Sequence, residues 1–426
     1  SENEFITQET EILFYYYIRT MKDIRIQLIL ILFSFSILQN SCQKEQNICD
    51  DSKDVADDEF SSELISNKYI VSLNEKAIEY HSQFRRSNPI QLSDIVLGIA
   101  EELYQKYPDL TVVSTIDYVY THSIVGFAGS MSAETAKKLS QDPLVEAVEQ
   151  DQMISLGKGG KPGRGKNTQP IQETPPGITR VNGTTYTGEN VAWIIDSGID
   201  TDHPDLNVDK KRGFSAFSKG KDARTDDGYG HGTHVAGTVA AIDNSIGVVG
   251  VAAGATVIPV KVLSSTGFGP NSGVIAGVDW VAKYGVSGDV ANMSLGGVIS
   301  SALDNAVIAA SNANGVKFCL AAGNESQDAN NTSPARANGI YIYTISAMNS
   351  SNDVFASFSN YGNPPIDYAA PGVNIYSCYI GGGYTTMSGT SMASPHAAGV
   401  LLLGSPNSGG TVKGDPDSNA DVIITH

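Results

Sequence analysis

Apolar residues in the second half of the chain gather in short runs separated by helix-like stretches. Five such runs lie at 191–195, 256–263, 290–294, 316–322 and 340–345. Continuous apolar runs between helices are typical of parallel strands whose sheet is covered on both faces. We therefore predict that residues 171–426 form an α/β domain with a doubly wound, mainly parallel sheet. In such sheets functional residues gather at the carboxyl ends of the strands.

Residues 67–156 show a different pattern, in which strands and helices follow the order β-α-β-β-α-β. The strands are expected at 69–73, within 112–125, at 125–129 and at 145–154, and the helices at 95–106 and 133–139. This order is that of a small ferredoxin-like α+β domain. A fold of this kind does not by itself indicate a function.

Residues 21–42 have the layout of a secretory signal peptide. Lys22 and Arg25 precede an almost entirely apolar stretch at 28–38. That stretch is about half as long as the roughly 20 residues that a transmembrane helix needs. A polar segment containing Cys42 follows, as in bacterial lipoprotein signals. Lipidation of Cys42 and ordinary signal cleavage therefore both stay open.

Three other segments are not expected to form packed structure. Residues 43–66 include an acidic stretch without aromatic residues at 50–59, which indicates a solvated tether. Residues 157–170 contain five glycines and several basic residues, so we expect an exposed linker that is open to proteolytic nicking. A basic patch for a partner is the alternative, but aromatic residues are missing there. Residues 1–20 are assigned no function.

Charge and composition narrow the function further. The chain has 46 acidic residues against 28 lysines and arginines, which gives a net charge of −18. This argues against nucleic-acid binding, because contacts with phosphates need clustered positive charge. Hydrophobic residues make up 41% of the sequence, which excludes full disorder. Four cysteines are too few for a disulfide scaffold at this length.

Four motifs place reactive side chains at strand ends or helix starts. Asp196 ends the first apolar run, and Asn324 follows the run at 316–322. His231 begins the helical stretch His-Gly-Thr-His-Val-Ala-Gly, and Ser391 precedes an apolar helix in Ser-Gly-Thr-Ser-Met-Ala-Ser-Pro-His. Taken alone, each has an ordinary explanation as a turn or cap residue. The two histidines of the helical stretch lack the acidic third ligand expected of a zinc site.

Together these side chains fill the roles needed to break an amide bond. An attacking serine hydroxyl needs a base to take its proton, a carboxylate to orient that base, and donors for the tetrahedral oxygen. Ser391, His231 and Asp196 fit the first three roles. Asn324 offers a side-chain amide as donor, and a helix N-terminus at Ser391 favours developing negative charge.

In their chain order Asp, His, Asn, Ser, the motifs resemble those of the subtilisin-like serine proteases, in particular the proteinase K-like members. The similarity covers about residues 172–403, and residues 67–156 are similar to the inhibitory, chaperone-like propeptide of that family. The resemblance implies four catalytic roles, in chain order: Asp196 as orienting carboxylate, His231 as general base, Asn324 as oxyanion donor and Ser391 as nucleophile.

The resemblance also implies a substrate-binding strand. Ser294, Leu295 and Gly296 match the edge strand whose free backbone groups would pair with an extended peptide. No acidic residue identified in the matched cleft segments demands a basic substrate. We therefore expect broad cleavage after apolar or aromatic residues.

Structural calcium is a further implication of the resemblance. The stretch 242–248 matches a calcium loop in which carbonyl and amide oxygens surround the ion. The expected ligands are Gln172, Asp205, Ile242, Asn244, Ile246 and Val248. Asp367 matches a second calcium ligand of the proteinase K-like members.

The C-terminal residues 404–426 depart from the family pattern, because its closing helices are missing. We expect an acidic surface tail there, with a calcium-binding loop at 414–421 as the alternative. Cys319 and Cys378 either pair or remain free, since pairing depends on distances that the sequence does not give.

These features predict a secreted or cell-surface serine endopeptidase that is made as an autoprocessed zymogen. It would act as a monomer on polypeptide substrates, with its own propeptide as intramolecular inhibitor. A catalytically silent surface lipoprotein that only binds peptides is the rival hypothesis. An intracellular peptidase is a third reading, which depends on whether the signal is used.

Overall fold

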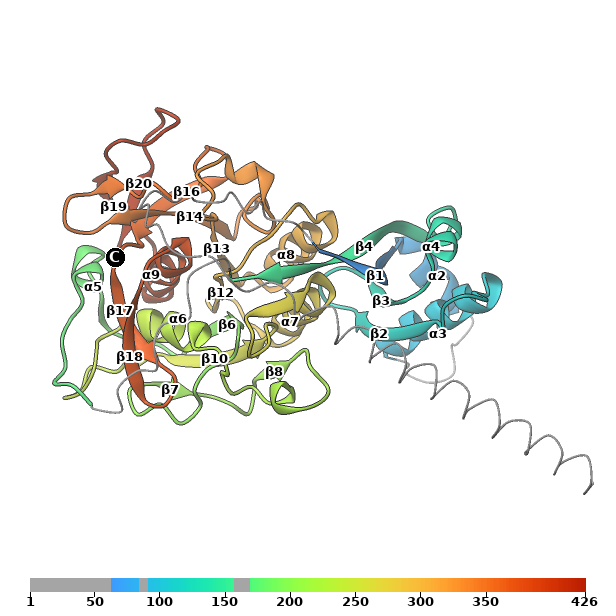
Figure 1. Cartoon of the computed structure of the whole chain (residues 1–426), viewed down its shortest axis with the longest axis horizontal. Helices are drawn as coiled ribbons and strands as arrows, with labels where there is room; N and C mark the ends of the chain where they lie inside the picture. The colour runs from blue at the N-terminus through green and yellow to red at the C-terminus, as the bar shows by residue number, and fades with distance from the viewer. Residues whose placement is uncertain (1–62, 84–90, 157–168) are drawn as a thin grey trace, which may run out of the picture. The chain divides into compact units, whose positions relative to one another are not determined.

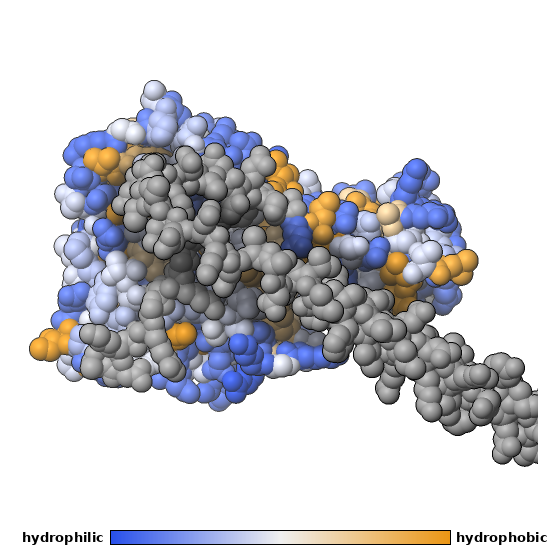
Figure 2. Space-filling model, viewed as in Figure 1, coloured by the Kyte–Doolittle hydropathy of each residue, from blue (hydrophilic) through white to orange (hydrophobic). Residues whose placement is uncertain are grey.

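The computed structural model describes residues 63–83, 91–156 and 169–426. The predicted signal peptide, Cys42, most of the tether and most of the linker lie outside these residues. Within them, no helix combines the length and apolarity that crossing a bilayer would require. Hydrophilic residues dominate the surface visible in Figure 2, and hydrophobic residues occur there in small separate groups.

The N-terminal domain has the predicted ferredoxin-like arrangement. Its antiparallel strands lie in the order β4-β1-β3-β2. They are β1 (Leu64–Leu73), β2 (Thr115–Tyr120), β3 (Gly126–Ser130) and β4 (Val145–Ser155), and the helices are α2 (Glu75–Gln83), α3 (Leu92–Lys106) and α4 (Ala133–Leu139). Helix α2 was not predicted, and β1 begins inside the segment expected to be a tether. Apolar residues of α3, including Ile99 and Leu103, are buried with Phe127 of β3.

The second domain is built on a parallel sheet, as predicted. Its parallel strands lie in the order β20-β16-β14-β13-β12-β6-β10-β7. In chain order they are β6 (Ala192–Asp196), β7 (Asn207–Val208), β10 (Thr256–Lys261), β12 (Val290–Met293), β13 (Lys317–Ala321), β14 (Ile342–Asn349), β16 (Ile366–Pro371) and β20 (Val422–Thr425). Every residue of β6 and β12 is buried. In β10 and β13, every residue except the first is buried.

Helices cover both faces of this sheet (Figure 1). They are α6 (His231–Ala240), α7 (Asn271–Tyr284), α8 (Ser301–Asn314) and α9 (Thr390–Leu403). Side chains alternate between the faces of a strand. Ala192 and Ile194 of β6 accordingly pack in one core cluster with α6 and α9. Trp193 and Ile195 pack in another with α7 and α8. The fully apolar run at β6 therefore reflects burial on both sides.

Shorter elements complete the domain. They are α5 (Pro176–Arg180), β5 (Thr184–Thr185), β8 (Phe214–Ser215), η1 (Lys221–Ala223), β9 (Ala252–Ala253), β11 (Phe268–Pro270), η2 (Ala329–Asn331), β15 (Val354–Phe355), β17 (Ile375–Tyr379), β18 (Gly383–Met387) and β19 (Asn407–Thr411). Strand β11 joins the sheet of the N-terminal domain by pairing with β4. The described residues belong to one compact unit of the chain.

The C-terminus is not the acidic surface tail that we expected. Strand β20 pairs with β16 at the edge of the main sheet, and Ile423 and Ile424 are fully buried. The carboxylate of Asp421 is buried as well and accepts hydrogen bonds from the Ser346 hydroxyl and from Nδ2 of Asn363. The apolar residues after Asp421 determine the structure of the C-terminus despite the acidic stretch before them, because burial of apolar surface stabilises the fold.

The two cysteines of the second domain do not pair. Cys319 on β13 and Cys378 on β17 are both free and fully buried. Burial raises the pKa of both thiols. Cys319 therefore acts as a small apolar core residue, whereas the Cys378 thiol lies 4.0 Å from Oδ2 of Asp205.

Candidate active site

Asp196 and His231 form a direct contact at the carboxyl end of the sheet. Asp196 is the last residue of β6, and His231 is the first residue of α6. Nδ1 of His231 lies 2.9 Å from each carboxylate oxygen of Asp196. Burial lowers the pKa of His231, but the charge and hydrogen bond of Asp196, with the charge of Asp227, raise it above the ordinary histidine value. The carboxylate thus makes the imidazole a stronger base.

Small residues and a carboxylate fix the start of α6 against β6. A Cβ on Gly232 would lie 2.1 Å from the carbonyl oxygen of Gly198, so only glycine allows this approach. Asp227 accepts hydrogen bonds from the main-chain N–H groups of Gly230 at 2.8 Å and Thr233 at 2.9 Å. This capping satisfies N–H groups of the first turn. His231 is therefore held beside Asp196 by the backbone.

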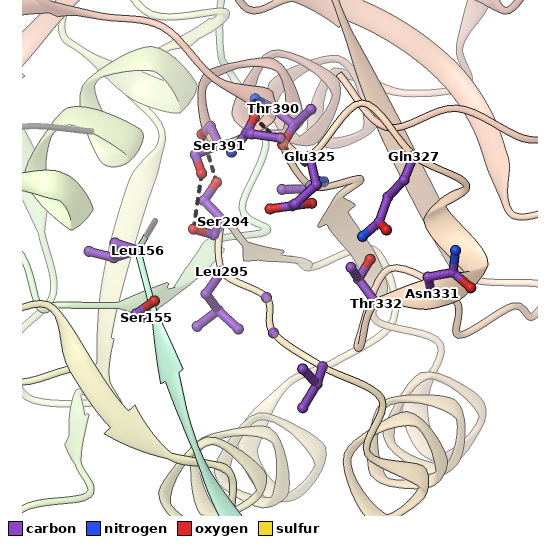
Figure 3. Close-up of a pocket in the computed structure, with 16 residues that line it drawn as sticks. Ser155, Leu156, Ser294, Leu295, Glu325, Gln327, Asn331, Thr332, Thr390 and Ser391 are labelled. Atoms are coloured by element: carbon purple, nitrogen blue, oxygen red, sulfur yellow. Dashed lines mark hydrogen bonds between the residues drawn. The ribbon is translucent and has the colours of Figure 1, made fainter. Parts of the chain in front are cut away.

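Ser391 lies in the first turn of α9, which packs against α6. Its hydroxyl donates to the carbonyl oxygen of Ser294 at 3.3 Å, and the Ser294 hydroxyl donates to the carbonyl oxygen of Ser391 at 2.7 Å (Figure 3). The structure thus brings Asp196 and His231 into contact. It directs the Ser391 hydroxyl to Ser294 rather than to the imidazole.

The side-chain amide of Asn324 lies close to the start of α9 and to the backbone nitrogen of Ser391. Oδ1 of Asn324 accepts from the main-chain N–H of Thr390 at 2.8 Å, which leaves the Nδ2 amino group to face elsewhere. The position that a Cβ would take on Gly389 lies 3.6 Å from Asn324 Oδ1, 3.8 Å from Asn324 Nδ2 and 3.7 Å from the nitrogen of Ser391. The Asn324 amide and the Ser391 nitrogen thus lie near each other, as the predicted pair of oxyanion donors requires.

Asn324→Leu is expected to lower kcat for peptide hydrolysis by about 10²- to 10³-fold, with little change in KM. In the role predicted for Asn324, the substitution removes a donor that acts mainly on the charge developing in the transition state. Steady-state kinetics on a chromogenic peptide measure the effect. Asn330→Ala, at an exposed asparagine of the following loop, is the control and should keep the parent kcat. A loss confined to KM would contradict the assigned role.

The end of β4 lies between two strands of the second domain. On one side Ser155 pairs antiparallel with Phe268 of β11, and the N–H of Leu156 donates to the carbonyl oxygen of Gly267 at 3.2 Å. On the other side Ser155 forms an antiparallel bridge with Gly296. An extended chain thus pairs with Gly296 of the predicted edge segment, as in recognition of peptides by β-augmentation.

A pocket opens beside this strand and Ser391 (Figure 3). Ser155, Leu156 and Leu295 border it on one side, and Gln327 and Thr332 on the other. A polar and an apolar wall face each other across the pocket.

The carboxylate of Glu325, which directly follows Asn324, also lines this pocket. Its Oε2 accepts a hydrogen bond from Nδ2 of Asn360 at 2.7 Å. Sequence analysis did not identify this acidic residue of the cleft. The position next to Asn324 was a signal that could have revealed it.

Two carboxylates of β4 lie at helix N-termini of the second domain. Glu149 accepts from the Ser300 hydroxyl and from the N–H of Ala302 at 3.1 Å, at the start of α8. Asp151 accepts from the N–H of Ser272 at 3.1 Å, at the start of α7. Negative charge is favoured at these ends of the helix dipoles. Sequence analysis missed both residues.

A third carboxylate belongs to the second domain and accepts hydrogen bonds from the N-terminal domain. Asp279 of α7 accepts from the successive main-chain N–H groups of Thr121, His122 and Ser123 at 3.0, 2.7 and 2.8 Å. These three residues form the turn between β2 and β3 of the N-terminal domain. The two domains are therefore joined by carboxylates from both sides.

The six residues expected to bind calcium lie together. Oδ1 of Asp205 accepts from Asn244 at 2.7 Å, Oδ2 accepts from the N–H of Val248 at 3.0 Å, and the Asp205 carbonyl oxygen accepts from the N–H of Ile242. Gln172 bonds to the N–H of Asn244. In the described part of the chain, the main-chain oxygens of Ile242, Ile246 and Val248 accept no hydrogen bond. Unused carbonyl oxygens around one buried carboxylate are a donor set that suits calcium.

Clusters of charged metal ligands are absent throughout the residues that the structure describes. The described ranges contain no group of three or more His, Cys, Asp and Glu side chains placed to hold a metal. Asp367 is exposed, and its carboxylate accepts a hydrogen bond from the N–H of Thr344 at 2.9 Å.

Comparisons with known proteins agree with this geometry. The subtilase family (Peptidase_S8) matches residues 189–407, and peptidase inhibitor I9 matches residues 68–157. Alkaline serine exoprotease A of Vibrio alginolyticus is 41% identical over 68% of this chain, and the match spans 53% of that protein. The chain thus covers about half the length of this relative.

Other relatives are covered more fully. Subtilisin NAT of Bacillus subtilis subsp. natto is 41% identical over 65% of this chain and 69% of its own length. The subtilisin-like serine protease AsES of Sarocladium strictum is 37% identical over 76% of this chain and 85% of its own. A crystal structure of a cold adapted subtilisin-like serine proteinase aligns with a TM-score of 0.52 and 36% identity, covering 59% of this chain and 97% of that one.

Proposed function

Because the chain belongs to the subtilase family of serine proteases, we propose that it is a serine endopeptidase made as a zymogen with an I9-type propeptide. The contact between Nδ1 of His231 and the carboxylate of Asp196 is the observation that supports this proposal most directly. The substrate is an extended polypeptide that pairs with Ser294, Leu295 and Gly296.

The proposed reaction is acyl transfer through Ser391. Its Oγ attacks the peptide carbonyl carbon while His231 Nε2 takes the hydroxyl proton, and Asp196 stabilises the imidazolium. Asn324 Nδ2 and the Ser391 N–H bind the oxyanion. His231 then gives its proton to the leaving amine, and water hydrolyses the acyl-enzyme with the imidazole again as base. The Ser391 hydroxyl must first leave Ser294 for the imidazole.

Hydrolysis of defined peptides tests this function. The processed protein should cut an extended peptide internally and release new N-termini, and a serine-reactive fluorophosphonate should stop the reaction. The rival hypothesis of a silent peptide-binding protein predicts binding without new N-termini. The role of Glu325 is tested by comparing kcat/KM for two peptides that carry lysine or norleucine immediately before the cleaved bond. The Glu325 carboxylate favours a cationic side chain in the pocket, so the lysine peptide should be cut faster.

The pairing register predicts where the chain cuts itself. Ser155 lies opposite Gly296, and Ser294, two residues before Gly296, exchanges hydrogen bonds with Ser391. Gly157 is outside the described residues. We predict cleavage after Gly157, so that N-terminal sequencing of the mature protein starts at Lys158. A mature N-terminus several residues away would contradict the register.

Structural calcium is part of the proposal. When bound, the ion would bring positive charge to the buried carboxylate of Asp205 and to the carbonyl oxygens of Ile242, Ile246 and Val248. Gln172 and Asn244 would supply their amide oxygens. Asp367 is proposed as a ligand of a second ion.

Removing calcium is expected to destabilise the protein, because a ligand that binds only the folded state stabilises it by mass action. At 100 times its Kd the ion contributes about 2.7 kcal/mol. Thermal unfolding with excess EGTA should occur at lower temperature than with millimolar calcium. Asp205→Asn should remove most of this difference, and an unchanged difference would contradict the assigned site.

We also propose that residues 21–42 direct secretion. Lipidation of Cys42 gains no support from the relatives and is not part of the proposal. Fractionation of cells and medium tests secretion, which predicts the mature protein in the medium.

A further inference from the structure

Two rings from outside the predicted calcium loop hold Asp205. The Tyr384 hydroxyl donates to Asp205 Oδ2 at 3.2 Å. Nδ1 of His203 accepts from the main-chain N–H of Asp205 at 3.2 Å. The two rings meet edge to face with centroids 5.4 Å apart. Both residues are buried, with 8% of Tyr384 and 3% of His203 exposed. Asp205 is thus fixed at its backbone and at its carboxylate.

The ring of Tyr384 also fits a gap in the loop itself. Gly247 has a φ of 65°, and a Cβ there would lie 2.1 Å from the Tyr384 hydroxyl oxygen. The ring therefore occupies space that only glycine leaves open at this turn. The loop on both sides of Gly247 carries the unused carbonyl oxygens of Ile246 and Val248.

Tyr384 belongs to the strand that leads to the proposed nucleophile. It lies in β18 (Gly383–Met387), which pairs with β17 and is followed four residues later by Ser391. His203 strengthens the same link, because its Nε2 lies 3.0 Å from the carbonyl oxygen of Gly383. Since Nδ1 accepts from Asp205, Nε2 carries the proton and donates to Gly383.

We propose that Tyr384 is a positioning residue for the calcium ligand Asp205, and that it couples ion binding to strand β18. Groups that hydrogen-bond a ligating carboxylate orient it and strengthen metal binding. Without the Tyr384 hydroxyl, Oδ2 would keep the N–H of Val248 at 3.0 Å and the weak thiol donor Cys378 Sγ at 4.0 Å. With these two donors alone, the carboxylate is held less firmly toward the loop. This inference rests on the proposed calcium site.

Calcium titration of the full chain tests the proposal. Ser391→Ala serves as the parent, so that self-digestion cannot interfere and the readout does not depend on protease activity. Calorimetry with Ca²⁺ alone should give a Kd that rises about 10-fold in Tyr384→Phe. Tyr376→Phe removes a hydroxyl from the paired strand β17 and is the matched control. Its Kd should stay within about twofold of the parent.

Hydrogen exchange tests the coupling to β18. Calcium should slow exchange of the Gly383–Met387 amides in the parent and do so much less in Tyr384→Phe. The calcium site itself would be overturned if the parent bound no calcium, or if Asp205→Asn bound calcium with the Kd of the parent. Normal binding by the parent with an unaltered Kd in Tyr384→Phe would overturn the positioning role alone.

Discussion

Replacing Ser391 by alanine is expected to abolish peptide hydrolysis and separation of the N-terminal domain. Turnover should fall by about 10⁶-fold, the loss known for a subtilisin without its serine nucleophile. Alanine lacks the oxygen that forms the proposed acyl-enzyme. Mass spectrometry of the purified precursor over time measures processing.

Ser388→Ala is the matched control, because that exposed hydroxyl only accepts a hydrogen bond from the N–H of Asn374. It should process like the parent. If purified Ser391→Ala matures by itself at the parent rate, self-cleavage by this site is wrong.

Asp196→Asn is expected to lower kcat by about 10⁴-fold while KM changes little. The amide keeps the size of the side chain but no longer stabilises the imidazolium of His231. The pH dependence should change as well. Burial lowers the pKa of His231, and Asp196 and Asp227 raise it above the ordinary value, so the parent gains activity as pH rises through that raised pKa.

Loss of the Asp196 charge should therefore move the acid limb of kcat/KM to lower pH. Asp226→Asn is the charge-matched control, because that carboxylate bonds to the Thr201 hydroxyl and not to His231. Equal shifts in both variants would show that net charge alone causes the effect.

Much of the fold could be predicted because burial on both faces leaves a clear pattern. Ala192 and Ile194 face one core and Trp193 and Ile195 the other, so β6 shows no polar position. The C-terminus was misread because its acidic residues were weighted above Ile423 and Ile424. Pairing with β16 depends on a tertiary contact that local composition does not encode.

The candidate site was predictable where a function requires a contiguous motif. Asp196, His231, Asn324 and Ser391 each lie in such a motif. The carboxylates that join the domains were not found, because Glu149 meets Ala302 across 153 positions of the sequence. A single acidic residue on a strand gives no sign of the helix end that it caps.

The most direct test of the account is to map the adduct of a fluorophosphonate on the processed protein. Phosphonylation needs a serine oxygen made nucleophilic by a neighbouring base. We predict one adduct, on Ser391, that forms slowly or not at all in His231→Ala. An unlabelled Ser391 in folded, propeptide-free protein, or labelling that is equally fast without His231, would contradict the central claim.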